Sequence, residues 1–118
     1  MVLDTTNYVD DSLSEYFSDL VWVVPYRKTK AKVALLLEHK TAPARFIHVQ
    51  LLSYMVSIWK QDIKEKRKYL TPILPIILYQ GKRTWRKRNF TELFKGIDAD
   101  FFKYLPIFDY ERDRKSVV

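Results

Sequence analysis

An acidic residue and a basic residue follow the most apolar stretch of the chain. Residues 32–40 read KVALLLEHK, so Glu38 and Lys40 follow closely on three leucines. Side chains alternate between the two faces of a β-strand, so Glu38 and Lys40 share one face and His39 points to the other. A carboxylate can bind a hard divalent cation, and an ammonium group beside it can hold a water or offset charge on phosphorus. Metal-assisted chemistry on a phosphate ester is therefore a candidate function.

A second carboxylate is predicted to face Glu38. Residues 19–26 (DLVWVVPY) are rich in β-branched and aromatic side chains, which favours a strand, and the polar RKTK that follows favours a turn. A hairpin closed midway between Lys28 and Thr29 pairs residues whose numbers sum to 57, which places Asp19 opposite Glu38. Directly opposed Cβ atoms lie about 5 Å apart. Two such carboxylates repel each other unless they share a cation, and the donor set suits Mg²⁺ or another divalent ion.

A long helix is predicted to follow, over residues 41–68, with Thr41 as a candidate cap and Pro43 in its first turn. Apolar residues recur there at helical spacing, which predicts a largely buried helix. Gln50, at the start of the expected second turn, and Tyr54 are four residues apart and share a face. We expect both side chains to point back over the sheet toward Asp19 and Glu38.

The predicted fold is α/β, with a mixed sheet in which an antiparallel hairpin is followed by a strand–helix–strand crossover. A third apolar strand, within residues 72–81, comes after the helix, and a crossover of this kind joins parallel strands. The 118 residues suit one domain. We expect a core over about 3–81, a basic loop over 82–88 and a helical C-terminal segment over about 90–118.

Positive charge is concentrated after residue 26. The chain carries a net charge of +7, and the part beyond residue 26 holds all 21 bases and nine of the 14 acids, a net +12. Basic proteins favour polyanions such as DNA. The predicted DNA-contacting side chains are those of the loop KRTWRKR, namely Lys82, Arg83, Arg86, Lys87 and Arg88. The alternative is a solvated loop with Trp85 buried in the core.

The ordered blocks YFSDLVWVV, LLLEHKTAP, LLSYMVSIW and LPIILYQGKRTW resemble the recombination-promoting nucleases, or YhgA-like putative transposases. These belong to the PD-(D/E)XK nuclease superfamily, to which Asp19, the Glu38-x-Lys40 pair and the Gln50-x-x-x-Tyr54 helix also look similar. The resemblance implies a restriction-endonuclease-like core and metal-dependent cleavage of DNA, linked to recombination or mobile DNA. It implies that Asp19 and Glu38 bind the metal, that Lys40 serves the nucleophile and that Gln50 assists.

Two departures from the family and several alternatives stay open. Ser18 stands where the superfamily has proline, and we expect the chain to lack the helix that precedes the first strand in this family. An uncovered sheet face would then favour self-association. Alternatives to a nuclease are an inactive DNA-binding remnant and a protein-interaction module, and the acids and Lys40 could be solvated strand-end charges.

The chain contains no cysteine and no apolar run of the roughly 18 residues that a membrane span requires. We therefore expect a cytoplasmic protein that does not bind membranes.

Overall fold

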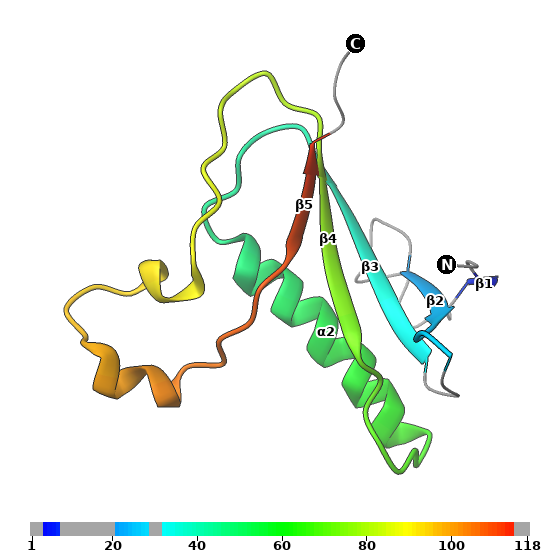
Figure 1. The fold of residues 1–118 in the computed structure, drawn as a ribbon. Helices are drawn as coiled ribbons and strands as arrows, with labels where there is room; N and C mark the ends of the chain where they lie inside the picture. The colour runs from blue at the N-terminus through cyan, green and yellow to red at the C-terminus, as the bar shows by residue number, and fades with distance from the viewer. Residues whose placement is uncertain (1–3, 8–20, 29–31, 115–118) are drawn as a thin grey trace.

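The computed structural model describes residues 4–7, 21–28 and 32–114. Within them the chain forms five strands, one α-helix and two short 3₁₀ helices (Figure 1). In chain order these are β1 (Asp4–Asn7), β2 (Val21–Pro25), β3 (Lys32–Lys40), α2 (Ile47–Lys64), β4 (Ile73–Tyr79), η1 (Phe90–Leu93), η2 (Ala99–Tyr104) and β5 (Glu111–Arg114). Asp19, Ser18 and the segment where the family's first helix is expected lie outside the described residues. No helix in the described ranges is long and apolar enough to cross a membrane.

All five strands form one mixed sheet in the order β1-β2-β3-β4-β5. The predicted hairpin is confirmed, because β2 pairs antiparallel with β3 from Val21 opposite Leu36 to Pro25 opposite Lys32, a register in which paired numbers sum to 57. The predicted crossover is also confirmed, because β3 and β4 are parallel, with Glu38 opposite Ile77. The α/β fold class inferred from the sequence is therefore correct.

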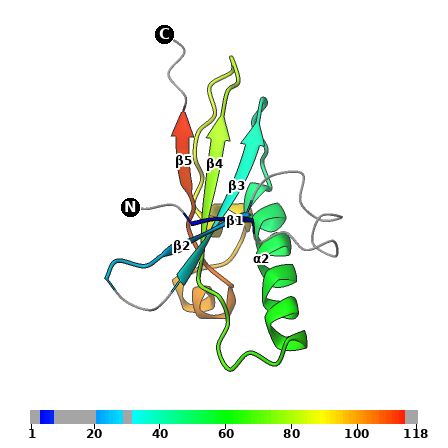
Figure 2. The same cartoon turned by 90° about the vertical axis from the view of Figure 1, so that its right-hand side faces the viewer.

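Helix α2 lies along one face of the sheet (Figures 1 and 2). The core between them is made by apolar side chains that alternate along the strands and recur along the helix: Val21, Ala34, Leu36, Ile77 and Tyr79 from the sheet, and Ile47, Leu51, Met55 and Ile58 from α2. Full burial of a side chain of this size contributes about 1.5–3 kcal/mol, so this layer dominates the stability. On the opposite face Leu35, Leu37 and Ile76 are half-buried and Leu74 is 38% exposed.

Helix α2 is shorter at both ends than predicted. It begins at Ile47 after a non-helical residue, Phe46, so Thr41 does not cap it and Pro43 lies in the preceding loop. A proline disfavours helical geometry in the residue before it, which explains why the helix does not begin at Thr41 or Ala42, where the chain bends. Gln50 consequently lies in the first turn and not the second; its backbone N–H donates to the Phe46 carbonyl over 3.2 Å. At the other end Lys66 has φ 59°, a left-handed conformation that stops the helix.

The predicted helical C-terminal segment is only partly helical. Two 3₁₀ helices occupy Phe90–Leu93 and Ala99–Tyr104, and Glu111–Arg114 forms the edge strand β5, parallel to β4. Strand β5 is not predicted from the sequence, because its residues ERDR have neither β-branched nor aromatic side chains. Charged residues are suited to an edge strand, where they discourage pairing with further chains.

A cluster of aromatic side chains packs this C-terminal segment against the start of α2. The buried ring of His48 makes edge-on contacts with Tyr110, Phe90 and Phe108, at centroid distances of 5.0, 5.4 and 5.6 Å. Neither imidazole nitrogen has a hydrogen-bond partner among the residues that the structure describes. Burial lowers the pKa of His48, an effect that nearby Asp109 opposes and Lys87 reinforces. The imidazole is therefore held in its neutral form and serves as an aromatic packing group.

Candidate active site

The Glu38 carboxylate is buried near the C-terminal end of β3. Its side chain is only 3% exposed, although two residues later the strand ends in a loop. A charged group in such a place requires partners, since an isolated buried carboxylate is strongly disfavoured. The local alternation puts Glu38 on the same sheet face as Ala34 and Leu36, which is the face that α2 covers. The first turn of the helix therefore supplies the neighbouring side chains.

Gln50 reaches from α2 to this carboxylate, as the sequence predicted. Its side-chain Nε2 donates to Glu38 Oε1 over 3.1 Å and to the Tyr54 hydroxyl over 2.9 Å. Gln50 and Tyr54 are one helical turn apart, so both side chains point the same way. The amide holds one carboxylate oxygen in a fixed orientation. The first turn of α2 thus fixes the orientation of the buried Glu38 carboxylate.

Lys40 supplies a positive charge on the same face. Its Nζ lies 3.6 Å from Glu38 Oε1, and the lysine side chain is 23% exposed. The pair thus couples a buried acid to a base that still reaches solvent. Such an ammonium group can hold a water molecule or stabilise negative charge that develops on a nearby phosphate. The structure brings together Glu38, Lys40, Gln50 and Tyr54, four residues that the sequence analysis placed in one site.

The fourth predicted catalytic residue, Asp19, lies outside the described residues. The confirmed register, in which Val21 lies opposite Leu36, would place position 19 opposite Glu38 if it continued two residues further. The facing of Asp19 and Glu38 therefore remains a prediction. In the described part of the chain, no group of three or more His, Asp or Glu side chains gathers as a complete metal site. Glu38 is a hard oxygen donor, which fits Mg²⁺, an ion that uses one or two carboxylates and keeps several waters.

Two cations of the basic loop form ion pairs within the described part of the chain. Arg86 contacts Glu92 over 2.6 Å, and Lys87 contacts Asp109 over 2.8 Å. Lys82 and Arg83 are exposed, and Arg88 is half-buried. Trp85 is 8% exposed and packs edge-on against the Tyr79 ring at 5.1 Å, which favours the core alternative for this tryptophan.

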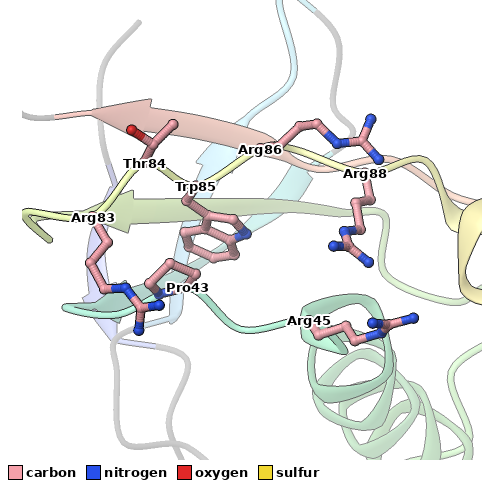
Figure 3. A pocket seen from close by; sticks show the side chains of 7 residues that line it. All are labelled: Pro43, Arg45, Arg83, Thr84, Trp85, Arg86 and Arg88. Carbon is pink, nitrogen blue, oxygen red and sulfur yellow. The ribbon is translucent and has the colours of Figure 1, made fainter.

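A cavity of about 360 Å³ opens beside this loop (Figure 3). Its walls come from the basic loop and from the segment between β3 and α2, and are formed by Pro43, Arg45, Arg83, Thr84, Trp85, Arg86 and Arg88. Arg45 is not predicted as a site residue, because nothing in the local sequence links it to a loop about 40 residues away. The predicted closeness of the ends of two parallel strands was the only signal that could have suggested it.

Residues 1–113 match the family model described as putative transposase, YhgA-like. The chain belongs to the YhgA-like putative transposase family. No solved structure matches it.

Two curated relatives of this YhgA-like chain are named as nucleases. It is 24% identical over 79 residues to "Recombination-promoting nuclease RpnA" of Escherichia coli (strain K12), a match that covers 67% of this chain and 27% of the relative. It is 25% identical over 83 residues to "Recombination-promoting nuclease RpnD" of Escherichia coli O157:H7, covering 70% and 32%. The matched region thus spans about a third or less of each curated relative.

Proposed function

We propose that this protein is a metal-dependent DNA endonuclease of the PD-(D/E)XK type, linked to recombination or mobile DNA. The observation that carries the proposal is the buried Glu38 carboxylate, held by the Gln50 amide and adjoining Lys40. The family match and the names of the two relatives support the same class of activity. The positive charge beyond residue 26 suits a polyanionic substrate.

In this proposal Glu38 and Asp19 would hold Mg²⁺ or a similar ion, which would supply Lewis-acid chemistry for phosphate ester hydrolysis. Gln50 fixes the orientation of the Glu38 carboxylate. Lys40 positions the attacking water and offsets the charge that develops on phosphorus. Water adds to phosphorus, the bond to one ester oxygen breaks, and that oxygen leaves as an alcohol after accepting a proton.

The test is cleavage of supercoiled plasmid with and without Mg²⁺. Glu38→Gln keeps the size of the side chain and its place beside Gln50 but removes the charge, and we expect it to slow cleavage by about 100-fold or more. Asp19→Asn should do the same. The matched control is Glu111→Gln, which removes one carboxylate from the exposed surface of edge strand β5 and should cut at the parent rate.

A second candidate is DNA binding without cleavage, favoured by the arginine-lined cavity. It predicts salt-sensitive DNA binding and no Mg²⁺-dependent product with the parent protein. Parent-like cleavage by Glu38→Gln would contradict the site assignment, while absence of cleavage together with retained DNA binding would favour this second candidate. Self-association through the sheet face opposite α2 remains a separate prediction, to be measured by light scattering.

A further inference from the structure

The cavity described above is lined by four arginines drawn from two distant segments of the chain. Arg83, Arg86 and Arg88 come from the loop after β4, and Arg45 comes from the loop before α2. Pro43 and Trp85 form apolar parts of the wall, and Figure 3 shows Arg88 pointing toward Arg45 while Arg83 extends beside Pro43. The volume, about 360 Å³, is within the range of pockets that enclose a small ligand or the end of a larger one.

Three of the four guanidinium groups have no carboxylate within ion-pair distance among the described residues. Only Arg86 is paired, with Glu92, whereas Arg45, Arg83 and Arg88 are not. The Arg45 guanidinium lies 5.6 Å from the centre of the Phe46 ring, a contact that leaves its hydrogen-bond donors available. Three like charges around one cavity repel one another, and a bound anion relieves that repulsion.

The cavity lies at the same end of the sheet as Glu38 and Lys40. Strands β3 and β4 are parallel, so the loops that follow them leave the sheet together, and the Gln80 N–H donates to the Lys40 carbonyl over 2.9 Å. The Tyr79 hydroxyl then donates to the Arg83 carbonyl over 2.5 Å, which fixes the start of the basic loop. The cavity and the Glu38–Lys40 pair are therefore both carried by the strand ends and loops at one end of the sheet.

We propose that this cavity binds the terminal phosphate of a DNA strand, so that the protein recognises phosphorylated DNA ends. A phosphodiester within a strand carries one charge, whereas a terminal phosphate carries about 1.5 to 2 near neutral pH, which better matches three unpaired guanidinium groups. Guanidinium groups also match the geometry of phosphate oxygens by donating two hydrogen bonds at once. This inference rests on the proposed function in assuming that DNA is the ligand.

The test is equilibrium binding without divalent metal, so that no strand is cut. Internally labelled oligonucleotides of one sequence carry a 5′-phosphate, a 3′-phosphate or hydroxyls at both ends, and fluorescence anisotropy gives each Kd. We expect one phosphorylated end to bind about tenfold more tightly than the hydroxyl form. The double variant Arg45→Gln/Arg88→Gln should abolish that preference, whereas Lys60→Gln, an exposed site on α2, should retain it.

Equal affinities for all three oligonucleotides, or a preference that survives in the double variant, would overturn the inference. So would competition by inorganic phosphate as effective as that by the unlabelled phosphorylated oligonucleotide, since the site would then bind a free anion. Glu38→Gln separates the two proposals, because it should keep the end preference while losing cleavage. An end preference in a parent protein that cuts nothing would leave this inference standing and refute only the nuclease activity.

Discussion

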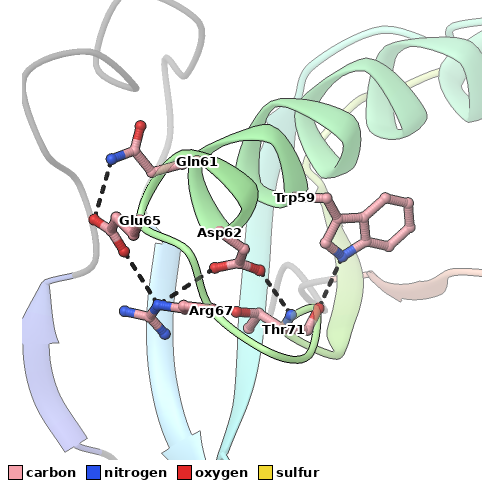
Figure 4. Close-up of polar contacts among 6 residues, drawn as sticks. All are labelled: Trp59, Gln61, Asp62, Glu65, Arg67 and Thr71. Carbon is pink, nitrogen blue, oxygen red and sulfur yellow. Dashed lines mark hydrogen bonds and ion pairs between the residues drawn. The ribbon is translucent and has the colours of Figure 1, made fainter.

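The junction between α2 and β4 depends on one buried acid, Asp62. Its side chain is fully buried, and Oδ2 accepts the Thr71 backbone N–H over 2.7 Å, two residues before β4 begins (Figure 4). Trp59 Nε1 donates to the Thr71 carbonyl over 2.8 Å, so α2 holds both backbone groups of Thr71. We therefore predict that Asp62→Ala destabilises the fold by releasing the start of β4 from the helix.

The expected cost follows from these contacts. A hydrogen bond to a charged group contributes about 1.5–3 kcal/mol, and its loss leaves the Thr71 N–H without that acceptor. The Arg67 Nε lies 3.7 Å from Asp62 Oδ1 and its side chain is 49% exposed, so that ion pair adds little. An unfolding entropy of about 2.1 cal/mol/K per residue gives about 0.25 kcal/mol/K for 118 residues, so a loss of about 2 kcal/mol lowers Tm by roughly 8 °C.

Thermal unfolding followed by circular dichroism at pH 7 measures this change. Asp62→Asn keeps an acceptor oxygen and should lower Tm less than Asp62→Ala does. Glu65→Ala is the control, since this exposed carboxylate contacts Arg67 over 3.1 Å at the surface and its loss should cost at most about 0.5 kcal/mol. A Tm of Asp62→Ala within about 2 °C of the parent, or no lower than that of Glu65→Ala, would refute the reasoning.

Two further predictions concern the packing around the loops. The pKa of His48 is lower in the folded chain than in the unfolded chain, so the unfolded chain binds a proton more readily. The contribution of His48 to the free energy of unfolding should be fully present above about pH 6.5 and should decrease as the pH falls below that value. In His48→Leu this pH-dependent contribution should vanish. Urea unfolding at pH 7.5 and pH 5 should then show a smaller decrease in the free energy of unfolding at the lower pH than in the parent. A decrease as large as the parent's would contradict this prediction. Gly81→Ala should destabilise by about 1–3 kcal/mol, because a Cβ there overlaps the buried Tyr79 side chain; a Tm equal to the parent's would contradict that overlap.

The sheet register was predictable because local signals agreed. The turn RKTK lies between two strongly apolar strands, and a slip of one residue would move Leu36 and Val21 to the wrong face. The helix spacing likewise brought Gln50 and Tyr54 to Glu38. These parts of the fold and site follow from periodicity and turn chemistry along a short stretch of chain.

Features that depend on tertiary contacts were not predictable. Strand β5 forms because the exposed edge of β4 offers hydrogen bonds to a charged segment with no strand propensity of its own. The start of α2 was predicted too early, because proline, here Pro43, is common in loops as well as in the first turn of a helix. Arg45 joins the cavity only because the loops after β3 and β4 meet at one end of the sheet.

The central claim is that the Glu38 carboxylate binds the divalent ion used in cleavage. Electron paramagnetic resonance of Mn²⁺, a paramagnetic substitute for Mg²⁺, measures binding directly and independently of activity. We expect the parent and Glu111→Gln to bind Mn²⁺ with the same Kd and Glu38→Gln to bind at least about tenfold more weakly. Equal Mn²⁺ affinity in the parent and Glu38→Gln would contradict the account.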